Sequence, residues 1–365
     1  MKILILSASP NIDATKSIVN AGVKRGHEMI VKNPSHLLML ISDKVNGYDR
    51  IYDGYGLDDK PERMKAKEYN AIIPRLGSNL SYGCLVLEHL NKNLSIFSTQ
   101  TSEAIKVAAD KMICQQKLSQ AKIRTPQTII GNQAIFPDFM LEQIGGLPAI
   151  AKELQGSQGN AVYPLESVYQ TNVFLKNFNK KKKNLLIQGF IDGSGKDIRA
   201  IVIDGRVVVA MERTAVKGEL RANISQGGSG AKIILSNEDQ EMCIKAARAC
   251  GHEVAGVDLM KDKEGKSFII EVNSNYGYGV ESLTGVDIST PLIEYCERNY
   301  KNGNAANLAT ATQTLQNEFN SQIMARINFA LNGTDNNGNK SVQKSEKDWR
   351  AEINTRINKA LGNAQ

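Results

Sequence analysis

The chain has 365 residues, of which 41% are hydrophobic and 23% charged, and its formal net charge is +7 at pH 7. This composition is ordinary for a soluble globular protein, and the length suits two or three packed modules. No apolar run approaches the roughly 18 to 20 residues that span a membrane, which argues against an integral helical membrane protein. Five scattered cysteines without a C-x-x-C spacing argue against a zinc site or a disulfide framework and predict a reducing, cytoplasmic location.

The first 93 residues have the pattern of a small α/β domain. Strands are predicted over residues 2–7, 27–31 and 70–75, and helices over residues 15–25 and 82–91. This alternation predicts a small parallel sheet with helices on both sides.

Residues 94–302 have a longer and more mixed pattern, which predicts a second, larger domain. It should begin with one long helix over residues 102–121, with Ser102 as its N-cap. Further strands are predicted over residues 148–152, 185–191, 197–203, 207–212, 253–260 and 267–272, and a helix over 237–250.

The most specific chemical signal lies in the last two of these strands. Alternation places Glu271 and Asn273 on one strand face, and a turn between the strands can bring Asp258 beside them. Two carboxylates and an amide oxygen suit magnesium, which takes hard oxygen ligands and shares its coordination shell with phosphates. The alternative is a solvated face of a hairpin, but uncompensated carboxylates within apolar strands are costly, which favours a divalent-metal site.

A second signal is Lys152, at the end of an apolar strand and before a glycine-containing loop. In this loop, Gly156, Ser157, Gln158 and Gly159 let backbone N–H groups approach phosphate oxygens, and the lysine adds a point charge. Taken alone, such a loop is more often an ordinary turn, and it is not a Walker A motif because no Gly-Lys-Ser/Thr follows.

Together the motifs resemble those of RimK-type ATP-grasp ligases across residues 1–300. The run comprises 73–77, Asp110-Lys111, 149–152, 156–159, 188–191, 197–199, 211–215, 221–223, 226–228, 256–258, 271–273 and 284–288. The resemblance implies an N-terminal pre-ATP-grasp α/β domain (1–93), a two-subdomain α+β ATP-grasp catalytic domain (94–302), and an extra helical tail (303–365).

The resemblance also implies the role of each candidate residue. ATP would be contacted by Lys111, Lys152, residues 156–159, the adenine-facing Gln188, Gly189, Phe190 and Ile191, and by Asp197, Arg221 and Asn223. Mg²⁺ or Mn²⁺ would be held by Asp258, Glu271 and Asn273. Arg199 and Arg213 would be the catalytic residues that stabilise transferring phosphate or orient a carboxylate, although both could instead be structural ion-pair partners.

The function implied is an ATP-dependent carboxylate–amine ligase that acts through an acyl phosphate and adds an amino acid, such as glutamate, to a peptide or protein. Three alternatives stay open: side-chain ester or amide crosslinking in a peptide, ligation on a small metabolite or carrier protein, and a non-catalytic nucleotide-binding regulator. Aromatic residues are not interleaved with the basic ones, so nucleic-acid binding is not supported.

The sequence departs from the family pattern at three places. Gly189 stands where an acidic hinge residue is usual, and Ala161 stands where the phosphate loop commonly has a further glycine. Residues 274–279 replace a Ser-Pro-Gly turn near the acceptor. The first two departures put the nucleotide preference in doubt, and the third puts the substrate in doubt.

Two further features carry no assigned chemistry. A run of four lysines at residues 180–183 is either a solvated loop or an attractor of acidic substrates. In the polar tail, residues 318–331 resemble residues 348–361, which predicts two amphipathic helices that dock on the body, pair across an oligomer or recruit a partner.

Overall fold

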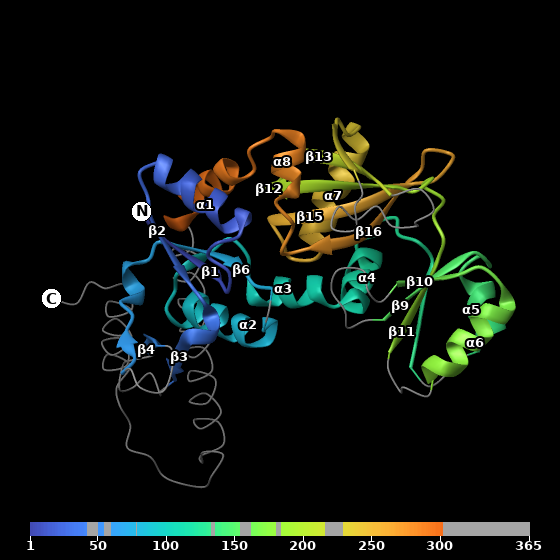
Figure 1. Ribbon diagram of the computed structural model, residues 1–365, viewed down its shortest axis with the longest axis horizontal. Coiled ribbons are helices and arrows are strands. Elements are labelled where there is room, and N and C mark those ends of the chain that lie inside the picture. The colour runs from blue at the N-terminus through green and yellow to red at the C-terminus, as the bar shows by residue number, and fades with distance from the viewer. Residues whose placement is uncertain are drawn as a thin grey trace, which may run out of the picture.

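The computed structural model describes residues 1–41, 50–54, 60–77, 79–132, 136–153, 162–179, 184–215 and 229–301. Several predicted features lie outside these described residues: Gly156, Ser157, Gln158, Gly159, Ala161, the lysine run 180–183, Arg221, Asn223 and the tail repeats. The described part contains an N-terminal parallel sheet, a central five-stranded sheet and a separate four-stranded sheet (Figure 1).

The N-terminal sheet is parallel and has the order β2-β1-β6-β7. Its elements are β1 (Lys2–Ser7), α1 (Asp13–Lys24), β2 (Glu28–Lys32), β6 (Ala71–Arg75), α2 (Leu80–Glu88) and β7 (Phe97–Ser98). In β1, Ile3 and Ile5 pack in the cluster that contains α1, while Leu4 and Leu6 pack in the cluster that contains α2. The predicted parallel sheet with a helix on each face is therefore confirmed.

Two local features differ from the prediction. An antiparallel sheet of β3 (Leu37–Leu40), β4 (Arg50–Asp53) and β5 (Glu62–Arg63) precedes β6 and was not predicted. The single helix over residues 102–121 was also wrong, because it is divided into α3 (Ser102–Ala109) and α4 (Lys111–Gln120). Thr101, rather than Ser102, is the N-cap of α3 and accepts from the Ala104 N–H, and Asp110 starts α4 by accepting from two backbone N–H groups.

The four-stranded sheet is antiparallel, with the order β10-β9-β11-β8. Its elements are β8 (Thr128–Gly131), α5 (Pro137–Gln143), β9 (Ala149–Glu153), β10 (Val162–Leu165), α6 (Val168–Asn179) and β11 (Leu185–Gly189). One face of the sheet, with Ala149, Ala151, Leu185 and Ile187, packs on α5 and α6 in a core of its own. The opposite face carries Ile150 and Lys152 by strand alternation.

The five-stranded sheet is antiparallel, with the order β14-β13-β12-β15-β16. Its elements are β12 (Lys196–Ile203), β13 (Arg206–Thr214), β14 (Ser229–Ile233), α7 (Asn237–Ala249), β15 (Val254–Lys261) and β16 (Ser267–Asn273). One face packs against α4 and α7. Part of the other face packs on the N-terminal domain, and the remainder carries the charged residues described below.

The N-terminal sheet and the five-stranded sheet share one hydrophobic core. Ile3, Ile5 and Ile73 from the first sheet and Ile201 and Met211 from the second belong to the same buried cluster. Helix α8 (Gly279–Thr284) and a helix over residues 289–301 lie beside α1 and contribute to this region (Figure 1). None of the helices that the structure describes is long and apolar enough to cross a membrane.

Candidate active site

The three predicted metal ligands come together on β15 and β16, the last two strands of the five-stranded sheet. Strands β15 and β16 pair in antiparallel register with Asp258 opposite Glu271 and Gly256 opposite Asn273. The Asn273 amide donates to Glu271 Oε1 at 3.1 Å, which leaves the Asn273 amide oxygen as an acceptor. The pairing that the sequence required for a shared site is therefore present.

Two arginines that the sequence assigned to catalysis bind the carboxylates of this same face. Arg199 donates to Asp258 through Nε at 2.7 Å and Nη2 at 2.6 Å. Arg213 donates to Asp197 at 2.6 and 2.8 Å and also to Asp258 at 3.0 Å. The four residues form an alternating chain of charge, Asp197–Arg213–Asp258–Arg199.

This network controls the charge of the carboxylates. The two arginines hold the pKa of Asp258 far below its usual value despite the opposing effect of burial. Burial and the neighbouring Asp258 charge raise the pKa of Asp197 above its ordinary value, although Arg213 opposes them. Asp258 is therefore a fixed anion in the folded protein.

The ion-pair alternative raised for Arg199 and Arg213 describes their contacts in this structure. Among the described residues, however, neither Nη1 donates a hydrogen bond, so each guanidinium keeps donors for a further group. The sequence reasoning raised ion pairing but did not identify Asp197 and Asp258 as the partners. The signal for this pairing was Asp197, Arg199 and Arg213 at alternate positions of largely buried strands, where charges need partners.

Lysines from two other elements lie near the carboxylates. Lys152 on β9 is half-buried, and the desolvation lowers its pKa; the positive charge of Lys111 lowers it further, while Glu271 and Asp258 oppose these effects. Lys111 is the first residue of α4, placed there by the Asp110 cap, and α4 is held to β16 by a bond from Gln115 Nε2 to Ile270 O at 2.9 Å. Lys152, Lys111 and the carboxylate face therefore border one region between the two sheets.

The predicted adenine-facing segment, residues 188–191, begins at the end of β11 in the four-stranded sheet. The Gly189 N–H donates to Gln127 O at 2.9 Å, the Phe190 N–H donates to Pro148 O at 3.4 Å, and the Gln188 side chain donates to Thr128. A Cβ on residue 189 would stand 2.7 Å from Ile144 O. This close backbone approach explains why glycine replaces the larger acidic residue of the family pattern.

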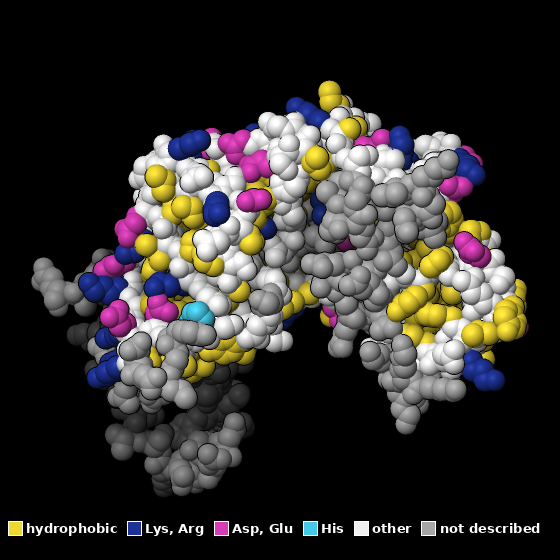
Figure 2. Space-filling view, in the orientation of Figure 1, with side chains coloured by type: hydrophobic (Ala, Val, Ile, Leu, Met, Phe, Trp, Pro, Cys, Tyr) yellow, Lys and Arg dark blue, Asp and Glu magenta, His cyan; other side chains and the backbone are white. Residues whose placement is uncertain are grey.

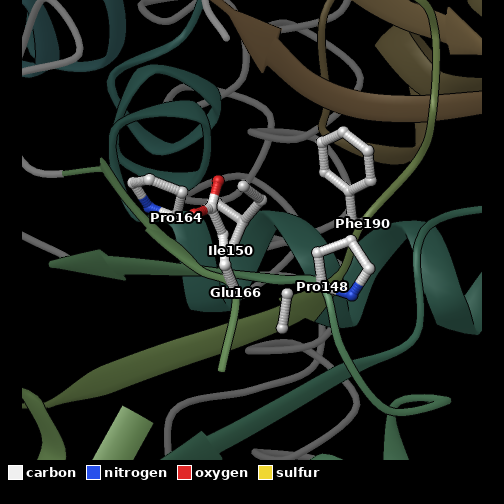
Figure 3. Close-up of a pocket in the computed structure, with 6 residues that line it drawn as sticks. Pro148, Ile150, Pro164, Glu166 and Phe190 are labelled. Carbon is white, nitrogen blue, oxygen red and sulfur yellow. The ribbon is translucent and has the colours of Figure 1, made fainter. Parts of the chain in front are cut away.

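A small, mainly apolar pocket adjoins this segment (Figure 3). Its lining residues are Pro148, Ala149, Ile150, Pro164, Glu166 and Phe190. Ile150 lies two residues before Lys152 on the same strand face, so alternation in the sequence was the signal that could have found it. An apolar pocket next to a lysine has the polarity that a purine base and its phosphates require.

The donor chemistry of the carboxylate face fits magnesium. Asp258 is ionised and accepts three hydrogen bonds, which leaves one lone-pair position on a carboxylate with about four. Glu271 and Asn273 add hard oxygen donors, the type that Mg²⁺ and Mn²⁺ prefer. No group of three or more His, Cys, Asp or Glu side chains in the described ranges could hold a metal ion by itself.

Comparisons with known proteins match almost the whole described chain. The model of the RimK-like ATP-grasp domain matches residues 108–296, and that of the RimK PreATP-grasp domain matches residues 1–105. A probable alpha-L-glutamate ligase from Trichodesmium erythraeum is 34% identical over 306 residues, which cover 83% of this chain and 98% of that protein. Another of that name from Shewanella pealeana is also 34% identical, over 82% of this chain, and the match spans 63% of that relative's length.

A solved structure extends the comparison to the fold. The ATP-grasp ligase PsnB, complexed with a phosphomimetic variant of a minimal precursor, Mg and ADP, aligns with a TM-score of 0.61 at 17% identity. The alignment covers 82% of this chain and 98% of PsnB. At this identity the likeness shows the fold, a pre-ATP-grasp domain followed by an ATP-grasp domain, and the fold prediction is confirmed.

Proposed function

We propose that this chain, which belongs to the RimK-like ATP-grasp family, is an ATP-dependent carboxylate–amine ligase. The observation that supports the activity most directly is the meeting of Lys152 and Lys111 with Asp258 and Glu271 between the two sheets. Cations for phosphate beside anions for a divalent metal suit a metal-bound nucleoside triphosphate.

In this proposal the nucleotide base enters the apolar pocket beside Phe190 and Ile150. Lys152 and Lys111 bind the phosphates, and the longer 3.4 Å bond of the Phe190 N–H is the one that a purine could replace. The roles of residues 156–159, Arg221 and Asn223 at the phosphates stay predictions, because they lie outside the described residues.

Asp258, Glu271 and Asn273 would hold Mg²⁺ or Mn²⁺, which supplies charge stabilisation to the phosphates when bound. Arg199 and Arg213 keep Asp258 ionised and oriented, and their Nη1 groups remain to bind a transferring phosphoryl group or the substrate carboxylate.

The proposed ligation has two chemical steps. A substrate carboxylate oxygen attacks the γ-phosphorus of ATP, and the bond between this phosphorus and the bridging β-phosphate oxygen breaks. ADP departs, and the substrate now carries an acyl phosphate. An amine attacks the acyl carbon, phosphate leaves with the bonding electrons, the nitrogen loses a proton, and an amide remains. Lys152 and the arginines contribute by positioning anionic groups that would otherwise repel one another.

The substrates are inferred from the relatives. Because both curated relatives are named probable alpha-L-glutamate ligases, we propose glutamate as an amino-acid substrate and a peptide or protein as the other partner. The division of the chain at residues 93 and 302, the cytoplasmic location and the oligomeric state stay predictions.

Hydroxylamine trapping tests the activity without knowledge of the amine. Purified full-length chain is incubated with ATP, MgCl₂, hydroxylamine and a panel of amino acids and acidic peptides, and ADP and hydroxamate are measured together. We expect both products in equal amounts with at least one carboxylate, and amide products by mass spectrometry when hydroxylamine is replaced by amino acids. ADP release that is independent of every carboxylate, or no ADP with any of them, would contradict the proposal. A side-chain crosslink in a peptide would instead identify the alternative ligase chemistry.

A further inference from the structure

The N-terminal sheet has a topological switch point between β1 and β6, the position at which open parallel sheets form a crevice. From β1 the chain moves outward to β2, whereas β6 lies on the other side of β1 and leads to β7. The two connections therefore diverge at the carboxyl ends of β1 and β6, where Ser7 is the register partner of Arg75. In open parallel sheets, divergence at this edge leaves room for a ligand.

Two tyrosines from the ATP-grasp domain, Tyr276 and Tyr278, pack against Arg75 at this edge. The Arg75 guanidinium carbon lies 5.3 Å from the ring centroid of Tyr276 and 5.1 Å from that of Tyr278. Arg75 Nη2 donates to the Tyr276 backbone oxygen at 2.9 Å, and the two rings stack with an interplanar angle of 13°. The Tyr276 Cβ also approaches Gly256, where an added Cβ would stand 2.8 Å away. Glycine at residue 256 therefore gives Tyr276 the room it occupies.

This cluster contains three buried donors that make no hydrogen bond of good geometry within the described residues, although the Tyr276 and Tyr278 hydroxyl groups lie close enough to interact. Arg75 Nε, the Tyr276 hydroxyl and the Tyr278 hydroxyl are all buried and have no hydrogen-bond partner among the described residues. The three residues are only 9%, 1% and 7% exposed. The Ser289 hydroxyl lies near that of Tyr278, but it bonds to Ser17 at 2.8 Å. Leaving a buried donor unpaired costs about 1–3 kcal/mol, so three in one place call for an acceptor.

The chemistry of the cluster specifies the acceptor. Burial raises the pKa of Tyr278 to about 12 and that of Tyr276 further, so both phenols are donors at neutral pH. Arg75 forms no ion pair within the described residues. The nearby Glu281 already accepts from Ser17 and from the Ile288 and Ser289 N–H groups. A cation with two neutral O–H donors and no committed anion matches a carboxylate.

We propose that Arg75, Tyr276 and Tyr278 bind a carboxylate of the substrate other than the one that is activated. This inference rests on the proposed ligase function. Tyr276 follows Asn273 by three residues, so their backbones are at most about 10 Å apart. An acidic group elsewhere in a peptide substrate can span such a distance, and a second carboxylate on the same amino acid can reach a cluster that lies closer to the phosphate site than this upper limit.

Removal of single hydroxyl groups tests the assignment. Tyr276→Phe and Tyr278→Phe keep both rings and their stacking under Arg75, and remove only an unpaired donor. We expect the KM for the carboxylate-bearing substrate to rise about tenfold in each variant, with the KM for ATP unchanged. Stability to urea should be unchanged or higher, because a buried unpaired hydroxyl is removed. Tyr295→Phe, in the same core but outside the Arg75 cluster, is the matched control and should leave both KM values unchanged.

The source of the carboxylate follows from which KM moves. A rise confined to L-glutamate identifies the amino acid, and a rise confined to an acidic peptide identifies the peptide partner. The opposing result is an active wild-type chain together with KM values for L-glutamate and for the acidic peptide that stay unchanged in both variants. In that case the tyrosines only hold the two domains together, and the proposal is overturned.

A binding measurement separates this inference from the activity. Glutarate, a plain dicarboxylate, should raise the melting temperature of the wild-type chain, and this rise should shrink in Tyr278→Phe but not in Tyr295→Phe. If no carboxylate supports ADP formation, the ligase proposal fails. The carboxylate-binding proposal is then tested only by the shift in melting temperature that glutarate causes. Equal or absent shifts in all three proteins would then overturn it.

Discussion

The two sheets that border the candidate active site carry charge in opposite ways. On the five-stranded sheet, Asp197, Arg213, Asp258 and Arg199 neutralise one another through hydrogen-bonded pairs. On the facing side of the four-stranded sheet, Lys152 is a desolvated cation that forms no ion pair within the described residues, although Glu271 and Asp258 lie near it. The first arrangement is complete before any ligand binds, whereas the second becomes favourable when phosphate arrives. Charge on one sheet should therefore support the fold, and charge on the other should support binding.

The largest expected effect is on catalysis, at the edge of the five-stranded sheet. Glu271→Gln keeps the size of the side chain but removes the charge that would face magnesium. We expect ADP formation to fall about 1,000-fold, equivalent to several kcal/mol of lost stabilisation, with unchanged stability to urea. Zinc should not replace magnesium or manganese in the wild-type chain. Glu264→Gln, in the exposed turn that follows β15, is the control, and equal turnover in both variants would remove Glu271 from the site.

The next effect concerns stability. Asp258→Asn leaves Arg199 and Arg213 without their shared anion, which should lower the free energy of unfolding by about 3–5 kcal/mol in urea titrations. Glu212→Gln breaks a partly exposed pair with Lys196 next to Arg213 and should cost no more than about 1 kcal/mol. If both variants lose the same small amount, the network does not stabilise the sheet.

The helical layers that pack on the two sheets should differ in how their stability depends on pH. His252, which lies between α7 and β15 and is hydrogen-bonded to Ala104 O at 2.9 Å, is 1% exposed, and burial lowers its pKa to about 4. Because the unfolded chain binds the proton more readily, stability should fall as the pH drops from about 6.5 to 4, by up to about 3 kcal/mol.

The layer behind the four-stranded sheet has an apolar core and offers no such group among its buried described residues. Hydrogen exchange at pH 5 should therefore show earlier opening around α7 than around α5 and α6. His252→Gln should flatten the pH dependence, and an unchanged slope in that variant would assign the acid sensitivity elsewhere.

The smallest effect is expected at Lys152. Lys152→Met should weaken ATP binding and turnover together by about tenfold, because the cation meets phosphate in both the ground and transition states. The same change should leave stability equal or raise it by up to about 1 kcal/mol, since a desolvated cation is removed. Lys176→Met, exposed on α6, is the control for surface charge. Loss of stability in Lys152→Met would mean that both sheets use charge in the same way.

The part of this site that follows strand periodicity could be predicted from the sequence. Glu271 and Asn273 share a face because side chains alternate, and the turn at residues 262–265 made Asp258 their neighbour. The alignment of Asp258 with Arg199 could not be predicted in this way, because it depends on pairing between β12 and β15, strands almost sixty residues apart. The helix break at Asp110 was a different kind of error: an aspartate that can cap a new helix was taken for a helix interior residue.

The shared core of the N-terminal and five-stranded sheets also has a consequence for protein engineering. Ile3, Ile5 and Ile73 fill the same interior as Ile201 and Met211, so a chimera that exchanges only the N-terminal domain would have to match a foreign surface. The core behind the four-stranded sheet closes on itself between Met140 and Ile187. That segment is the more self-contained unit to exchange between relatives, and such an exchange would test the proposal that it binds the nucleotide base.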